Sequence, residues 1–212
     1  MNMNALRSSH PFVAVCAVSF CVVGCSLMSP PKGVTTRSFV LTPITVPSPT
    51  ARTKSTNMVV GIRPVKMAGY LSGKPLAMRQ RNNEIVYLES IEWAERVDTA
   101  LQRVLAADLG TLIPTDQVRL SRWAPETVAV EVEVNVDRFD VDSHGQGVLM
   151  AWWRVLSPGD EKDIASGRFS ASRKGPPPNT DPVAAAALMS SLAGDLAEKL
   201  ASAINARESK TK

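Results

Sequence analysis

Cysteine, histidine and concentrated charge are all scarce in this chain of 212 residues. Its three cysteines, Cys16, Cys21 and Cys25, lie in the first 25 residues, so the remainder can form no internal disulfide and no cysteine-based zinc site. With only His10 and His144 as histidines, most metal and nucleophilic chemistry is also out of reach. The composition therefore predicts a protein that is not an enzyme and needs no cofactor.

Charge of one sign is not concentrated either, because 24 Lys and Arg residues face 20 Asp and Glu residues for a net charge of +4. A dedicated nucleic-acid-binding protein places its basic residues on one face, so we expect no nucleic acid partner. A phosphate-binding glycine loop is absent, since Gly145-Gln-Gly147 lacks the third glycine and the helix that should follow. What is present is an apolar fraction of 44%, enough for one domain with a substantial core.

The first 24 residues have the build of a secretory signal peptide. Arg7 and His10 give a weakly basic start, and an apolar run from Phe12 to Val23 follows. Such a run of about 12 residues spans about 18 Å, well short of the ~30 Å hydrocarbon core of a bilayer. The segment is thus suited to a signal core, and an uncleaved membrane anchor is the alternative.

The run ends in Val22-Val23-Gly24-Cys25, which resembles the bacterial lipobox, where cleavage precedes the cysteine. The resemblance implies that Cys25 carries acyl chains such as palmitate on its thiol and on its new amino group. Two lipid signals already make membrane attachment stable, so three chains would make it permanent. Ser26 follows where an Asp usually marks inner-membrane retention in Gram-negative bacteria, so the resemblance points to the outer membrane, facing the periplasm.

Composition divides the rest of the chain into a tether, one domain and a tail. Residues 25–35 hold two prolines and a glycine without apolar periodicity, which is typical of a flexible, here lipidated, tether. Residues 36–206 form the predicted domain, and residues 207–212 are expected to fray.

Hydrophobic periodicity within the domain predicts both strands and helices. One helix is expected from Ser90, as its N-cap, to Leu109, and an alanine-rich helix from Pro182 to Ala206 with Asp181 as its cap. The expected strands cover residues 37–42, 58–65, 75–79, 84–88, 127–137, 148–156 and 164–172. The predicted fold class is α/β: a single domain with a mixed β-sheet of about five to seven strands packed with two main helices.

Residues 127–137 give the clearest strand pattern, with valine at every even position from 128 to 136. The next apolar residues fall on odd positions, so one extra residue near Arg138 is expected to form a β-bulge. The following strand, 148–156, is apolar on both faces, which predicts a central strand that is covered twice.

A hydrolase would have to use four polar residues of this region. Glu131 and Glu133 lie about 7 Å apart on one strand face, but a half-exposed strand needs polar residues there, so we interpret them as a solvated or interface face. Asp142 and His144 share one turn, where neighbours cannot readily converge as a triad, so we interpret His144 as a turn residue. A cell-wall hydrolase built from these four residues is the enzymatic alternative.

Aromatic residues are the candidates for partner contact. Trp152 and Trp153 point to opposite faces of their strand, so one belongs to the core, while the other either packs under a helix or anchors a partner. Tyr70 and Trp93 are further candidates.

Short motifs along nearly all of the chain after the tether, from about Phe39 to Ile204, resemble the ABC-type transport auxiliary lipoproteins of the paraquat-inducible protein C type. In order, they are Phe39-Val-Leu41, Val59-Val-Gly-Ile-Arg-Pro-Val65, Tyr70-Leu71, Met78-Arg79, Trp93-Ala-Glu-Arg96 with its helix to Leu109, Arg138-Phe139-Asp140, Leu149 with Trp153, and the alanine-rich terminal helix. One departure is Ala68-Gly69, since the family usually has a proline shortly before the Tyr-Leu pair.

The resemblance implies a non-catalytic docking subunit at the outer membrane. Its partners would be a periplasmic MCE-domain protein and, indirectly, an ABC permease and ATPase that move phospholipids or similar lipids between the membranes. The family offers no catalytic residues to carry over. A scaffold lipoprotein of another envelope assembly machine fits the same residues, and the sequence leaves a homo-oligomer open.

Overall fold

The computed structural model describes residues 35–44, 58–81, 83–113, 115, 117–120, 123–160 and 162–211, with side chains to residue 206. The predicted signal peptide, Cys25 and nearly all of the predicted tether lie outside these residues, as does the side-chain detail of the predicted tail. The fold belongs to the compact unit Thr36–Lys212.

The described part of this unit contains nine strands, two α-helices and two short 3-10 helices. They are β1 (Arg37–Phe39), β2 (Val59–Ile62), β3 (Lys66–Met67), η1 (Gly69–Leu71), β4 (Pro75–Arg81), β5 (Glu84–Trp93), α1 (Val97–Leu112), β6 (Gln117–Leu120), η2 (Pro125–Thr127), β7 (Val130–Asp142), β8 (Gln146–Leu156), β9 (Asp163–Lys174) and α2 (Pro182–Thr211). The predicted α/β class, single domain and mixed sheet are confirmed. The strand count was too low because β3 and β6 are too short to show a periodic pattern.

The long strand β7 organises the sheet. One of its edges pairs antiparallel with β8, which in turn pairs antiparallel with β9. Its other edge pairs in parallel with three short strands in succession, β2, β3 and β4. Beyond them, β6 adds to β2, while β5 and then β1 add to β4. β7 therefore joins all parts of the domain, which places its two faces at the centre of the fold.

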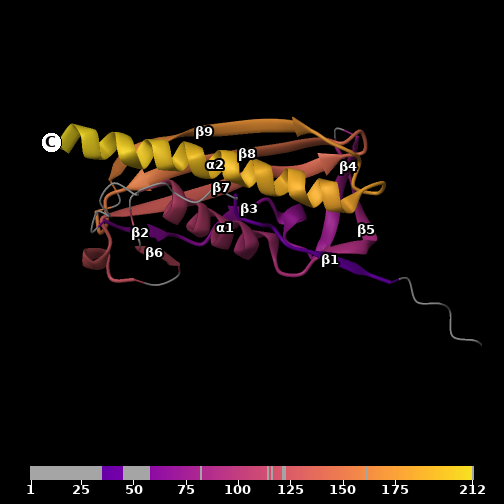
Figure 1. Ribbon diagram of the computed structural model, residues 1–212, viewed down its shortest axis with the longest axis horizontal. Helices are drawn as coiled ribbons and strands as arrows, with labels where there is room; N and C mark the ends of the chain where they lie inside the picture. The colour runs from indigo at the N-terminus through magenta and orange to yellow at the C-terminus, as the bar shows by residue number, and fades with distance from the viewer. Residues whose placement is uncertain are drawn as a thin grey trace, which may run out of the picture. The chain divides into compact units, whose positions relative to one another are not determined.

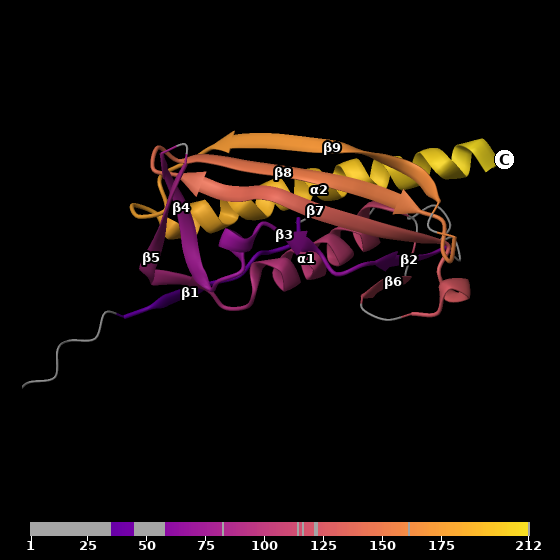
Figure 2. The ribbon, with the colours of Figure 1, turned by 180° about the vertical axis from the view of Figure 1, so that it is seen from behind.

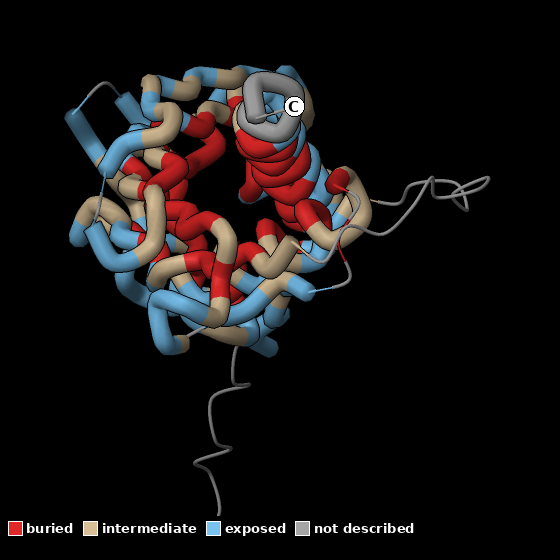
Figure 3. The backbone as a smooth tube through the Cα atoms, turned by 90° about the vertical axis from the view of Figure 1, so that its left-hand side faces the viewer, coloured by how far each residue is buried: buried red, intermediate tan, exposed pale blue. Residues whose placement is uncertain are grey.

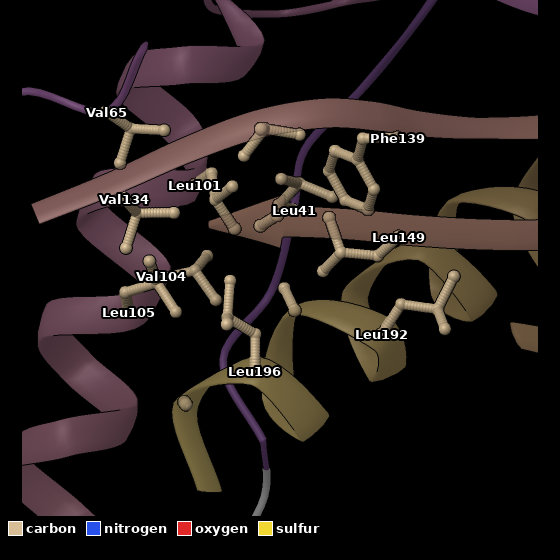
Figure 4. Packing of buried hydrophobic residues seen from close by; sticks show 14 of the residues in the cluster. Leu41, Val65, Leu101, Val104, Leu105, Val134, Phe139, Leu149, Leu192 and Leu196 are labelled. Atoms are coloured by element: carbon tan, nitrogen blue, oxygen red, sulfur yellow. The ribbon is translucent and has the colours of Figure 1, made fainter. Parts of the chain in front are cut away.

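Both α-helices lie on the same face of the curled sheet, so this inner face forms the core (Figures 1 and 2). In the end view, the parts of the backbone coloured as buried lie on the inner side of the strands and on the side of α2 that faces them (Figure 3). The valines of β7 meet Leu101, Val104 and Leu105 of α1 and Leu192 and Leu196 of α2 (Figure 4). All of these side chains are buried, which accounts for the apolar stripe along each helix.

The segment from Leu41 to Ile44 lies between the two helices. Leu41 is buried in the core, between leucines of α1 and α2 (Figure 4). Arg103 of α1 donates a hydrogen bond to the Leu41 carbonyl over 3.1 Å, and the Thr42 amide donates to Ser190 Oγ of α2 over 3.1 Å. The Ile44 amide donates to Asp108 Oδ1 of α1 over 2.9 Å. This segment therefore hydrogen-bonds both helices and is part of the interior.

The start of α1 differs from the prediction. Residues Ser90 to Trp93 continue strand β5, and the helix begins at Val97 with Arg96 as its N-cap. Strand pairing keeps these residues extended, because the Trp93 amide donates a hydrogen bond to the Lys74 carbonyl over 2.8 Å and β1 pairs in parallel with the end of β5. Ile91 and Trp93 are buried in that strand, so long-range pairing outweighs the local capping residue.

Two local predictions are confirmed by the backbone. The β7–β8 register shifts between Val136 and Arg138, as expected for a bulge. Asp181 caps α2, because its Oδ1 accepts a hydrogen bond from the Ala184 amide over 3.0 Å.

The prediction that β8 is covered on both faces is wrong. β8 is central in its pairing, but Met150 and Trp152 on its outer face are 42% and 45% exposed. The α-helices cover the inner face, and no described element covers these two side chains.

Candidate functional site

The outer face of the sheet, opposite the helices, carries Glu131, Glu133 and Trp152 among the residues that the sequence singled out. The bulge in β7 decides which residues reach it. Before the bulge, Glu131 and Glu133 point outward, and after it, Arg138 and Asp140 do so. This switch in parity allows one strand to present charged side chains at both of its ends while its valines and Phe139 stay in the core.

Asp140 is fully buried at one end of β7 and holds three polar side chains. Tyr70 from η1 donates its hydroxyl to Asp140 Oδ2 over 2.8 Å, and Arg79 Nη2 of β4 donates to the same oxygen over 2.9 Å. Arg138 Nε donates to Asp140 Oδ1 over 3.0 Å. Two guanidinium groups therefore share one buried carboxylate. We call these four residues the Asp140 cluster.

The surroundings of Tyr70 suppress its ionisation. Burial, together with the hydrogen bond to the Asp140 carboxylate, raises the pKa of Tyr70 to about 12. Tyr87 of β5 adds support by donating its hydroxyl to the Tyr70 carbonyl over 3.0 Å. Tyr70 is thus a fixed hydrogen-bond donor and not a general base at neutral pH. The Tyr70 hydroxyl is already hydrogen-bonded within the cluster. A contact between Tyr70 and a partner protein remains a prediction.

At the other end of β7, five charged residues form what we call the Glu133 cluster: Arg63, Lys66, Glu131, Glu133 and Arg154. The Glu131 carboxylate lies 2.5 Å from Arg63 Nη2 and also accepts the Trp123 indole N–H over 3.0 Å. Glu133 accepts from Lys66 Nζ over 3.1 Å and lies 3.3 Å from Arg154 Nη1.

The prediction that these two glutamates form a solvated face needs correction. Glu131 and Glu133 are 5% and 8% exposed, because basic side chains from the β2–β3 connection, β3 and β8 cover them. Burial alone would raise the pKa of Glu133, but the Lys66 ammonium and the Arg154 and Arg63 guanidiniums outweigh it and hold that pKa below its ordinary value. Both groups serve ion pairing, which is incompatible with a free general acid.

Trp152 lies between the two clusters, on the outer face of β8. Its neighbour across the strand pair is Arg168 of β9, whose guanidinium carbon lies 4.2 Å from the indole centroid. This cation–π contact fixes the ring while leaving it 45% exposed. The alternative that Trp152 packs under a helix is therefore wrong, and its role as a partner anchor remains a prediction.

Trp153 and Trp93 lie elsewhere. Trp153 is 5% exposed beneath α2, as expected for the core member of the tryptophan pair, and Trp93 is 3% exposed at the end of β5. Their burial leaves neither ring accessible to a partner in this conformation, which corrects the expectation for both as contact residues.

The four residues of the hydrolase alternative do not converge. Asp142 and His144 occupy the β7–β8 turn, where Asp142 Oδ1 accepts the His144 and Gln146 amides over 2.8 Å each, and Gly145 has a φ of 80°. Glu131 and Glu133 lie at the far end of the same strand, about 30 Å away at 3.3 Å per residue. Within the described residues, no group of three or more His, Cys, Asp or Glu side chains could hold a metal ion.

Sequence reasoning found most members of the Asp140 cluster without relating them to one another. Tyr70, Arg79 and the pair Arg138 and Asp140 belong to three separate motifs, and Asp140 lies 70 positions from Tyr70 and 61 from Arg79. The bulge was the available indication, because it predicts that Asp140 changes face. In the part of the chain that the structure describes, no helix is both long and apolar enough to cross a membrane.

A family model for the "ABC-type transport auxiliary lipoprotein component" matches residues 39–201 of this chain. No curated protein matches the chain in sequence. Among solved structures, protein XCC0632 from Xanthomonas campestris, of family DUF330, is similar with a TM-score of 0.64 and 16% identity, over 84% of this chain and 98% of that chain. The crystal structure of an uncharacterized protein is similar with a TM-score of 0.59 and 18% identity, over 82% and 98% of the two chains. At these identities the likeness supports the fold alone.

Proposed function

Because this chain belongs to the ABC-type transport auxiliary lipoprotein component family, we propose that it is a non-catalytic docking subunit of an MCE-type ABC transport system. In this role it is held by acyl chains in the outer membrane and faces the periplasm. It contacts a periplasmic MCE-domain protein, and through that protein the permease and ATPase that move lipids across the envelope.

The observation that carries this proposal is the exposed apolar pair on the outer face of β8. Met150 and Trp152 are 42% and 45% exposed although β8 is hydrogen-bonded on both edges. A tryptophan fixed on a central strand loses little conformational entropy on binding, and tryptophan and arginine dominate interface energetics. Arg168 beside Trp152 supplies the second of these residue types.

The membrane anchor rests on the sequence. Gly24 precedes Cys25, and Ser26 follows it, which favours acylation and transfer to the outer membrane over inner-membrane retention. Mass spectrometry of the mature amino-terminal peptide should find a diacylglyceryl and an additional acyl group on Cys25. Density-gradient separation should place the protein with outer-membrane markers. An unmodified amino terminus would contradict the anchor and the proposed location.

The docking role is tested by crosslinking intact cells and recovering the lipoprotein from solubilised envelopes. We expect an MCE-domain protein in the recovered material. Trp152→Ser should reduce that recovery at least fivefold, since it removes the central contact. Leu120→Ser is the matched control: Leu120 is 38% exposed but lies on β6, at the far edge of the sheet, and its substitution should leave recovery unchanged.

Other outcomes discriminate the alternatives. Repeated absence of any MCE protein under crosslinking would contradict the proposal. Recovery of a different envelope assembly complex in its place would favour the scaffold alternative. A hydrolase is disfavoured by the ion pairing of both glutamates and by their separation from Asp142 and His144.

A further inference from the structure

An open cavity of about 690 Å³ lies where the tip of the β4–β5 hairpin meets the β7–β8 turn. Nitrogen donors dominate its wall: Arg79, Gln80, Arg81, Arg138 and His144. Two carboxylates, Glu84 and Asp142, also line it. The cavity adjoins the Asp140 cluster through the shared residues Arg79 and Arg138, and Arg138 pairs across the strands with Met150, at the edge of the surface proposed for docking.

Arg138 is held in place with its outer donors unused. Its Nε donates to the fully buried Asp140 over 3.0 Å, which fixes the guanidinium plane. Its two terminal nitrogens have no acceptor among the described residues. Because the buried carboxylate holds Nε, the two terminal nitrogens of the guanidinium are preorganised to donate to an oxyanion. The spacing of these two nitrogens matches that of two phosphate oxygens.

The two acidic residues of the wall restrict which phosphate fits. Glu84 Oε2 lies 3.9 Å from Arg81 Nε, and Asp142 uses Oδ1 to accept two backbone amides of its own turn. Their negative charge opposes a free, doubly charged phosphate ion. It suits a singly charged phosphodiester that carries an amino group beside it, because the ammonium can then face a carboxylate.

The position of the cavity in the domain favours a lipid as the source of that group. β1, from which the chain runs back toward Cys25, lies at the same end of the domain as the β4–β5 hairpin (Figure 2). The ten residues between Cys25 and Thr36 reach at most about 35 Å when extended. The choice of a lipid as the ligand rests on the proposed acylation of Cys25. The presence of hydrogen-bond donors in the cavity is independent of it.

We propose that this cavity binds the headgroup of a membrane phospholipid of the phosphoethanolamine class. Arg138 and Arg81 bind the phosphodiester, and Glu84 and Asp142 face the ammonium group.

The test uses the mature lipoprotein in a non-ionic maltoside detergent and water-soluble headgroup probes, so that partition into micelles does not contribute. Glycerophosphoethanolamine, glycerophosphoglycerol and inorganic phosphate are titrated separately, and the Arg side-chain Nε signals are followed by NMR. We expect saturable binding of glycerophosphoethanolamine, weaker binding of glycerophosphoglycerol and the weakest binding of inorganic phosphate.

Variants separate the contributions. Arg138→Gln should weaken glycerophosphoethanolamine binding at least fivefold. Arg81→Gln, at a side chain that is 84% exposed and uninvolved in folding contacts beyond Glu84, should weaken it about threefold. Glu84→Gln should reduce the preference for the ethanolamine probe over the glycerol probe. Arg119→Gln on β6 is the control and should change nothing.

Three results would overturn the proposal: no saturable binding of any probe, equal binding by wild type and both arginine variants, or inorganic phosphate binding as tightly as glycerophosphoethanolamine. The last result would assign the cavity to free phosphate. Because these measurements need no MCE partner and use soluble probes, their failure is distinguishable from failure of the docking proposal.

Discussion

The Glu133 cluster and the Asp140 cluster occupy opposite ends of β7 and differ in how exposed the cations around each carboxylate are. Glu133 is contacted by cations from three sides, and one of them, Lys66, has a side chain that is 72% exposed. Asp140 is 0% exposed, and its partners Arg79 and Arg138 have side chains that are only 18% and 27% exposed. Some of the cations of the first cluster are therefore largely exposed to solvent, whereas those of the second are mostly buried.

This contrast shows that the number of ion pairs in a cluster is a poor guide to how much the cluster contributes to stability. A pair screened by solvent contributes little, whereas removal of one partner from a desolvated pair leaves uncompensated charge. The Asp140 cluster also joins η1, β4 and β7, which no other described polar cluster does. We therefore expect substitutions at the Asp140 end to affect folding, and those at the Glu133 end to affect stability modestly.

The largest effect should come from Asp140→Ala. It leaves two guanidinium groups and the Tyr70 hydroxyl without their shared acceptor, and should lower the free energy of unfolding by about 3 kcal/mol. Urea denaturation followed by circular dichroism measures the change. Asp137→Ala, at the exposed bulge residue of the same strand, is the control and should cost less than about 0.5 kcal/mol. Equal effects of the two would remove the distinction between the clusters.

Tyr70→Phe should have the next largest effect, about 1.5 kcal/mol, because it removes a hydrogen bond to a charged acceptor. The substitution should also change how the free energy of unfolding depends on pH in the alkaline range. The pKa of Tyr70 is raised to about 12 in the folded state, against an ordinary value near 10, so its contribution is complete below pH 10 and is lost as the pH rises toward 12.

Denaturation curves recorded between pH 9 and pH 12 test this dependence. Wild type should lose stability over that range more steeply than Tyr70→Phe. The chain contains two tyrosines, and Tyr87→Phe should retain the wild-type alkaline slope. If the slope followed Tyr87 instead, the assignment of the buried hydroxyl would be wrong.

Glu133→Gln should cost about 1 kcal/mol at neutral pH, since only part of the charge network is lost. The pKa of Glu133 is lowered in the folded state, so its contribution is present above the ordinary value near 4.3 and is lost as the pH falls through the lowered value. The variant should therefore show a shallower loss of stability below pH 4. Glu126→Gln, at an exposed residue of η2, should leave the acid limb as in wild type.

The smallest effect should come from Lys66→Ala. Its ammonium lies 3.1 Å from Glu133, but a side chain that is 72% exposed interacts through solvent. We expect a loss below about 0.5 kcal/mol that disappears in 1 M salt. A loss above 2 kcal/mol would mean that the Glu133 cluster is as desolvated as the Asp140 cluster.

The local sequence pattern correctly predicted which side chains of β7 face the core, but it did not predict the burial of the charged side chains on the outer face. The valine alternation and the parity change in β7 identified its core side chains and its bulge, because both depend on neighbours in sequence. The fate of Glu131 and Glu133 depends instead on Arg63 and Arg154, which only the pairing of β2 and β8 with β7 brings near. A polar face in sequence is compatible with either exposure or ion pairing.

Strand pairing also explains the errors at element boundaries. Ser90 is a good helix N-cap in isolation, but β5 continues through it because β1 and the Lys74 carbonyl provide partners. β6 has four residues, three of them exposed, so no periodicity could reveal it. In both cases the deciding partner is remote in sequence.

The position of Leu41 to Ile44 has a practical consequence for anyone shortening this protein. A shortened version that starts at Met58, just before β2, would keep both α-helices and every strand except β1. It would nevertheless remove the segment that packs between α1 and α2 and leave a cavity at the position of Leu41. Arg103, Asp108 and Ser190 would also lose their backbone hydrogen-bond partners. A truncation should therefore begin no later than Thr36.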